Sequence, residues 1–316
     1  MVHGIPRLSA RSYWAALKGS FVHVGENNLA LISAGVAFFS MLSLFPALAA
    51  LIAVLGLVSD PVVVIAQLEE MRAFMPNDVY EILNDQVVSL VTASSDTLGW
   101  AGVISLAVAL WSARAGVSAM ITGLNSVYNE RDRNTAKHYF QALLLTVALV
   151  SVGIVALMAL VVLPVVMAFF PLGPMGTIVI EILRWFVAIS ILFAGIGLLY
   201  RYGPNRKAAR IKWLSLGAVI AVVFWVILSV AFSYYVANFS NYNQVYGSIG
   251  AVIALLIWLW ISSFLVLFGA ALNAQIEMYT KRDSTIGPPK PVGKRGAFAA
   301  DTVLKAGGDA TSADER

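Results

Sequence analysis

The sequence has no cysteine and only three histidines among 316 residues. Without cysteine there is no disulfide, no thiolate nucleophile and no Cys-based metal site. His3, His23 and His138 are far apart, and none has a partner at metal-ligand spacing. The phosphate-binding pattern Gly-x-x-x-x-Gly-Lys followed by Ser or Thr is also absent. We therefore expect neither a bound metal nor a cofactor.

Charged residues are also scarce in this sequence. Only 12% of the residues are charged, whereas an ordinary soluble domain has about 25%. Hydrophobic residues make up 59% of the chain and the mean hydropathy is +0.82, which indicates an integral membrane protein. The net charge is +4, but the basic residues lie beside the apolar runs, where the positive-inside bias explains them. We therefore expect no nucleic-acid partner.

Long apolar runs dominate what is present. Each is about 20 residues or longer, enough to cross a hydrocarbon layer of about 30 Å as a helix. The runs cover about residues 29–58, 98–121, 140–163, 178–200, 213–236 and 247–277. Because the first begins only at Leu29, we interpret it as a retained span and not as a secretory signal peptide.

Orientation follows from the distribution of cations. The stretch from Arg201 to Lys212 carries five cations and no acid between two apolar runs, which places it on the cytoplasmic side. On this map the outer segments hold only Arg72 and Arg184 of the 21 Lys and Arg residues. The sequence thus predicts an all-α polytopic protein with six transmembrane helices and both termini in the cytoplasm.

The segments around the spans have distinct compositions. Residues 1–28 contain a stretch, 9–24, that predicts a short helix in the cytoplasmic interface. Residues 59–97 hold seven acids against Arg72, which predicts an outer segment with two short amphipathic helices. Residues 281–316 are rich in Pro, Gly and charge, which predicts a disordered cytoplasmic tail. Pro46 should kink the first span. The kink would serve either simple helix packing or the opening and closing of a gate.

Four blocks of sequence support a family resemblance. They are AGVAFFSMLSLFPAL at 34–48, ALWSARAGVSAMITGLNSVYNERDR at 109–133, LLYRYGPNRK at 198–207 and YGSIGAVIALLIWLWISSFLVLFGAALNAQIE at 246–277. Over about residues 12 to 280 the chain resembles the YihY/virulence factor BrkB family. The resemblance implies a six-span, multi-pass protein of the bacterial plasma (inner) membrane.

Two functional labels accompany that family. One is the tRNA-processing ribonuclease BN, which needs clustered His and Asp ligands that this sequence lacks. The other is a role in the cell envelope, including serum resistance in a pathogen and the handling of lipids. Because the spans offer only Arg114, with Glu181, Arg184 and Glu277 near their ends, we expect that the protein is not an enzyme.

Candidate binding residues follow from the matched blocks and from the cost of burying polar groups. Arg114, inside the second span, either contacts an anionic group or extends to the cytoplasmic headgroups. Arg201 and Arg206 form a basic inner rim that either binds an anion or only fixes the topology. Supporting polar contacts are assigned to Asn125, Tyr128, Asn205, Asn273 and Gln275.

The leading hypothesis is therefore an inner-membrane protein that transports or flips an amphipathic anionic lipid or envelope precursor. Its expected partners are membrane lipids, with such a lipid as substrate. The alternative is a membrane scaffold or regulator of envelope assembly, which would bind an envelope protein or a second copy of itself through the outer segment. A transporter should contain a cavity that reaches Arg114, whereas a scaffold should be tightly packed.

Overall fold

A computed structural model describes residues 8–58, 95–168, 174–207, 211–238, 248–280, 283–304 and 310–311. In these ranges most of the chain is helical, which confirms that the fold is all-α. The helices are α1 (Ala10–Glu26), α2 (Leu29–Val58), α5 (Ser95–Tyr128), α6 (Thr135–Ala168), α7 (Pro174–Tyr202), α8 (Ile211–Asn238), α10 (Ser248–Met278) and α11 (Phe298–Asp301). Two short strands, β1 (Val303–Leu304) and β2 (Ala310–Thr311), pair in antiparallel fashion after α11.

Five of the described helices, α5, α6, α7, α8 and α10, are long and apolar enough to cross a membrane. The count reaches six if α1 and the first part of α2, Leu29–Leu44, are taken as one span bent by 66°. The bend falls at Asn28, whose φ of 50° lies in the left-handed region that asparagine tolerates. The chain is therefore a multi-pass membrane protein. The six-span topology and the side of each terminus remain predictions.

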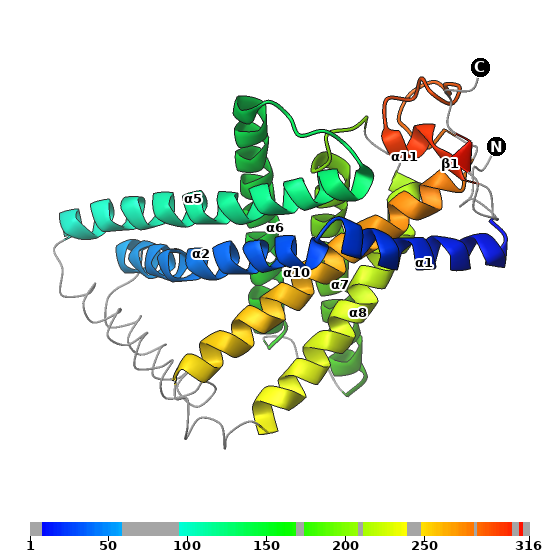
Figure 1. The fold of residues 1–316 in the computed structure, drawn as a ribbon. Helices are drawn as coiled ribbons and strands as arrows, with labels where there is room; N and C mark the ends of the chain where they lie inside the picture. The colour runs from blue at the N-terminus through cyan, green and yellow to red at the C-terminus, as the bar shows by residue number, and fades with distance from the viewer. Residues whose placement is uncertain are drawn as a thin grey trace.

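Helix α10 lies at the centre of the fold. Figure 1 shows α2 and α5 side by side, with α10 crossing beneath them and α8 running next to α10, while α6 and α7 stand on the far side. Helix α10 contacts α1, α2, α5, α8 and α11. The main buried cluster surrounds it and includes Leu124, Val127, Tyr128 and Leu267, each with no more than 1% of its surface exposed.

Small residues bring α8 and α10 into backbone contact. A Cβ atom built on Gly217 would lie 2.0 Å from the carbonyl oxygen of Gly269, and one built on Gly269 would lie 2.5 Å from that of Gly217. Beside this contact Ala270, Ala271 and Ala274 are fully buried. The small residues of α10 therefore form a helix-contact face.

The second span ends later than the sequence predicts. The predicted runs 98–121 and 140–163 leave residues 122–139 as the connection, but α5 continues to Tyr128 and α6 begins at Thr135. The extra turns remain helical because Leu124 and Val127 pack into the central cluster. Only residues 129–134 form the connection. The predicted outer helices lie outside the described residues, apart from the start of α5 at Ser95.

The chain after α10 also differs from expectation. Residues 283–304, here called the C-terminal segment, were expected to be disordered, yet they form a compact fold that ends in α11 and β1. Two carboxylates organise it by accepting backbone N–H groups. Asp283 accepts from Thr285 (2.9 Å) and Lys290 (2.8 Å), and Asp301 accepts from Gly293 (2.7 Å) and Gly296 (3.0 Å). Composition alone does not reveal such bonds.

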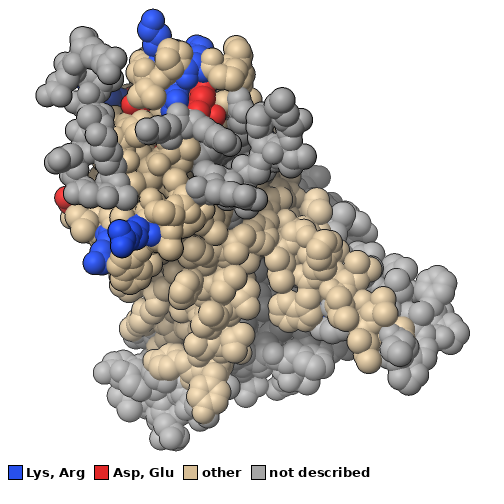
Figure 2. All heavy atoms as spheres, turned by 90° about the vertical axis from the view of Figure 1, so that its right-hand side faces the viewer, with Lys and Arg blue, Asp and Glu red and all other residues tan. Residues whose placement is uncertain are grey.

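Charged side chains gather at one end of the molecule. Figure 2 shows the blue and red side chains over the upper part of this face, whereas the residues described in its lower part are coloured tan, as neither basic nor acidic. We use the name charged end for the loops 129–134 and 203–207, the end of α10 and the C-terminal segment.

Candidate functional site

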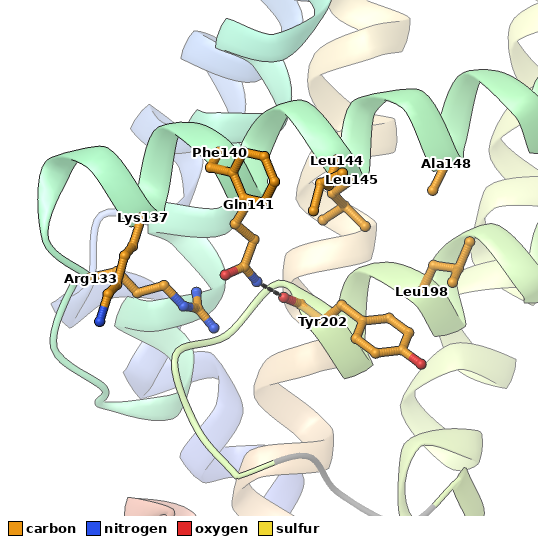
Figure 3. Close-up of a pocket in the computed structure, with 9 residues that line it drawn as sticks. All are labelled: Arg133, Lys137, Phe140, Gln141, Leu144, Leu145, Ala148, Leu198 and Tyr202. Carbon is orange, nitrogen blue, oxygen red and sulfur yellow. Dashed lines mark hydrogen bonds between the residues drawn. The ribbon is translucent and has the colours of Figure 1, made fainter.

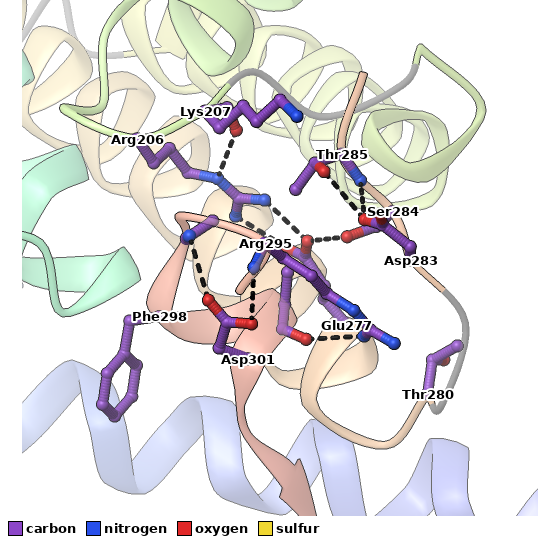
Figure 4. Close-up of polar contacts among 12 residues, drawn as sticks. Arg206, Lys207, Glu277, Thr280, Asp283, Ser284, Thr285, Arg295, Phe298 and Asp301 are labelled. Carbon is purple, nitrogen blue, oxygen red and sulfur yellow. Dashed lines mark hydrogen bonds and ion pairs between the residues drawn. The ribbon is translucent and has the colours of Figure 1, made fainter. Parts of the chain in front are cut away.

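The charged end contains a buried ion pair between Arg206, in the loop after α7, and Glu277, in the last turn of α10. The two guanidinium Nη atoms donate to the two carboxylate oxygens at 2.7 and 2.6 Å. The side chains are only 3% and 5% exposed, and Figure 4 shows them pointing toward each other. Burial alone would lower the pKa of Arg206, but the charge and hydrogen bonds of Glu277 raise it above its ordinary value.

Four of the predicted site residues meet around this pair. The Arg206 guanidinium lies 4.8 Å from the ring centroid of Tyr128, a cation–π contact. The Tyr128 ring is buried, and its hydroxyl has no hydrogen-bond partner among the described residues. Asn125 donates to Asp132 (2.7 Å) and accepts the Asn205 backbone N–H (2.7 Å). Asn125, Tyr128, Asn205 and Arg206 therefore form one polar cluster.

The other four predicted residues lie elsewhere. The Arg114 guanidinium packs 5.1 Å from the Trp111 ring and 4.2 Å from the Tyr139 ring. Trp111 is 61% exposed, whereas Arg114 is partly buried between the two rings, and its Nε has no hydrogen-bond partner among the described residues. Arg201 lies over the ring of Tyr202 at 5.5 Å.

Asn273 and Gln275 serve helix packing. The Asn273 Oδ1 accepts the backbone N–H of Gly217 (2.8 Å) where α8 and α10 touch. A Cβ atom on Gly19 would lie 2.7 Å from the Oε1 of Gln275, which shows how closely α1 approaches α10 there. Both amides therefore lie where α10 packs closely against a neighbouring helix.

An open groove lies between α6 and α7 next to the charged end. Its volume is about 520 Å³. Figure 3 shows Arg133 and Lys137 at one end and Ala148 and Leu198 toward the other. The remaining lining residues are Phe140, Gln141, Leu144, Leu145 and Tyr202. The groove is therefore amphipathic, with cations at its mouth and apolar side chains along its length.

The mouth of the groove is held by the two loops of the charged end. Arg133, from the loop after α5, donates to the carbonyl oxygens of Gly203 (2.9 Å) and Pro204 (2.7 Å) in the loop after α7. Burial lowers the pKa of Arg133, and the nearby charge of Asp132 opposes that shift. Gln141 donates to the Tyr202 carbonyl. Among the described residues Lys137 forms no ion pair, so its ammonium group is free to meet an anion.

The sequence pointed to part of this arrangement. Arg133 and Lys137 are not among the predicted site residues, and Glu277 was predicted only as a titratable group near the end of a span. A signal for Glu277 did exist, because it is the single acid in the 31 residues of α10 and needs a buried partner there. The groove, by contrast, depends on how α6 leans against α7, which no local pattern encodes.

The chemistry open to these groups is non-covalent. The described residues contain no group of three or more His, Cys, Asp or Glu side chains that could hold a metal ion. Arg114 is not among the groove residues, so the cavity does not reach it. The outer segment that the scaffold alternative requires lies outside the described residues. A basic mouth joined to an apolar groove can bind an amphipathic anion.

Comparison with known proteins places the chain in a family. It is 32% identical over 275 residues to YfkH of Bacillus subtilis, named as ribonuclease-like, covering 82% of this chain and 93% of that protein. It is 32% identical over 95 residues to a UPF0761 membrane protein of Idiomarina loihiensis (30% and 33% covered). A UPF0761 membrane protein of Mannheimia succiniciproducens is 25% identical over 194 residues (60% and 64% covered).

No solved structure matches the chain. The sequence profile described as virulence factor BrkB, however, matches residues 20–293, which include the polar cluster and the groove. Because this match covers most of the sequence, the chain belongs to the virulence factor BrkB family.

Proposed function

We propose that this protein binds an anionic amphipathic lipid or envelope precursor in the groove between α6 and α7 and moves it between the leaflets of the bacterial inner membrane. The observation that carries the proposal is the groove itself. Its mouth contains Arg133 and Lys137, and its walls are apolar. A volume of about 520 Å³ falls within the usual range of about 300–1,000 Å³ for small-molecule sites.

The groove suits the two halves of a lipid. Lys137 presents a point charge that a phosphate headgroup would neutralise, and each cation near an anionic lipid surface contributes about 1 kcal/mol. Phe140 and Leu144 are exposed by 61% and 55%, so an acyl chain lying over them would contact apolar surface only. In the positive-inside orientation the mouth faces the cytoplasmic leaflet, where an anionic precursor made in the cell would enter.

Charge should control which lipid moves, whereas the apolar wall should control whether any lipid moves. We therefore expect Lys137→Ala to slow the translocation of a fluorescent phosphatidylglycerol in proteoliposomes by about five- to tenfold, the effect of losing about 1 kcal/mol or slightly more. The rate for phosphatidylcholine should remain close to wild type. Leu144→Trp should fill the groove and slow both lipids.

A matched control is Lys290→Ala, which removes an exposed lysine of the C-terminal segment and should change neither rate. All variants should be compared at equal protein content, with folding checked by gel filtration. If wild-type protein moves neither lipid faster than protein-free vesicles do, the transport proposal is wrong. If Lys137→Ala slows both lipids equally, the assignment of the headgroup to the mouth is wrong.

A further inference from the structure

The C-terminal segment contacts three elements of the charged end at once. Ser284 donates to the Glu277 carboxylate of the buried ion pair. The backbone N–H of Lys207, in the loop 203–207, donates to the carbonyl oxygen of Gly296 at 3.0 Å. The backbone N–H of Phe298 donates to Oε1 of Glu130, in the loop 129–134, at 2.9 Å. Figure 4 shows the segment folded over Arg206 and Glu277.

The segment is attached by packing as well as by hydrogen bonds. Ala299 of α11 belongs to the main buried cluster, and Leu304 of β1 packs against that cluster. Arg295 is only 4% exposed and donates to the carbonyl oxygen of Ala300 at 2.7 Å, which closes the segment on itself. A segment with its own internal bonds and a buried alanine is a structural part of the charged end.

The loops that the segment holds are the same two loops that form the mouth of the groove. Glu130 is three residues from Arg133, which bonds Gly203 and Pro204. Lys207 lies a few residues after those two carbonyls. The two loops at the mouth are therefore joined directly by Arg133 and are also both bonded to the C-terminal segment.

From this shared attachment we infer that the C-terminal segment is an intramolecular clamp that holds the two loops together and restricts entry to the groove. The clamp closes when Glu130, Lys207 and Glu277 are all bonded to the segment. Its release frees the loops 129–134 and 203–207 and widens the mouth. The effect on lipid entry rests on the proposed function, whereas the effect on the loops does not.

Hydrogen–deuterium exchange on the full chain tests the clamp. The two test variants are Asp301→Ala, which removes the acceptor that organises the segment, and Glu130→Ala, which removes the acceptor of Phe298. The amide of Lys207 bonds the Gly296 carbonyl of the segment itself, so faster exchange there reports only that the segment has detached. The informative amide is Asn205, which donates to Asn125, a residue the segment does not bond in the described contacts.

We expect the exchange of the Asn205 amide to rise about tenfold in both variants, the effect of weakening local closure by about 1.4 kcal/mol. Glu26→Ala removes an exposed acid of α1 and should leave that exchange unchanged. The variants should also take up lipid faster in the proteoliposome assay. If only Lys207 exchanges faster, the segment is a passive cover and the clamp is refuted. If Asn205 exchanges faster in a protein that moves no lipid, the clamp stands and the transport proposal fails.

Discussion

At the scale of single residues, the buried ion pair of Arg206 and Glu277 is the feature whose two members depend most on each other. Two charges with 3% and 5% exposure have lost most of their hydration, and their mutual bonds compensate for much of that loss. The Ser284 hydroxyl and the Tyr128 ring add contacts to the carboxylate and the guanidinium, respectively. Each partner is therefore tolerated because the other is present.

This dependence predicts an asymmetry between single and double substitutions. Glu277→Ala leaves a buried guanidinium without its carboxylate and should destabilise the protein by about 3–5 kcal/mol. The double variant Arg206→Met with Glu277→Leu removes both charges and should recover most of that loss. Unfolding in detergent, followed by circular dichroism against denaturant, measures both. A single-variant loss below about 1 kcal/mol, the range of exposed ion pairs, would show that the pair is hydrated in solution.

At the scale of helices, the glycines at the contact between α8 and α10 leave almost no room for a side chain. Gly269 faces three atoms that a side chain would meet: the Gly217 carbonyl oxygen and the Tyr200 hydroxyl at 2.5 Å, and the Ala221 Cβ at 3.0 Å. The Gly217 oxygen and the Ala221 Cβ are fixed to the α8 backbone, so neither can shift unless the helix itself moves. Overpacking at this position must therefore separate the two helices.

We accordingly expect Gly269→Ala to destabilise the protein by about 1–3 kcal/mol. Its matched control is Gly153→Ala in α6, where a Cβ atom would meet nothing within 4 Å. That control should be neutral or slightly stabilising, because alanine favours a helix over glycine by about 0.5–1 kcal/mol. Thermal unfolding of both variants in the same detergent decides the matter. Equal melting temperatures would mean that α8 and α10 are less closely packed than the structure shows.

At the scale of the whole molecule, the sequence predicts what depends on composition and periodicity. Long apolar runs define the helices that are long enough to cross a membrane. Four of the eight proposed site residues meet at the charged end because short polar stretches at neighbouring helix ends come together there. Arg114 does not join them, since its position on α5 directs it to Trp111 and Tyr139 instead.

What the sequence does not predict depends on contacts between distant segments. The C-terminal segment has the composition of a disordered tail, and its order comes from two carboxylates that accept backbone N–H groups and from docking on Glu130 and Lys207. The groove likewise exists only after α6 and α7 are placed beside each other. Tertiary packing supplies both features.

The orientation of the molecule is the remaining prediction at this scale. If the loops 129–134 and 203–207 and both termini are cytoplasmic, the charged end, the clamp and the mouth of the groove all face the cell interior. The acidic stretch 59–97 must then face outward. A lipid made in the cell would reach the groove from the correct side only in this orientation, so the proposed direction of transport depends on it.

The absence of native cysteine makes the orientation directly measurable, because each introduced cysteine is the only thiol in the protein. We expect Lys294→Cys, in the C-terminal segment, to react with a membrane-impermeant maleimide only after intact cells are opened. Asp78→Cys, in the acidic stretch, should react in intact cells of the same strain. If Lys294→Cys were labelled in intact cells, the charged end would face outward and the mouth of the groove would lie in the outer leaflet. The proposed lipid would then have to enter from the periplasmic side, so this labelling pattern determines which leaflet the translocation assay should load first.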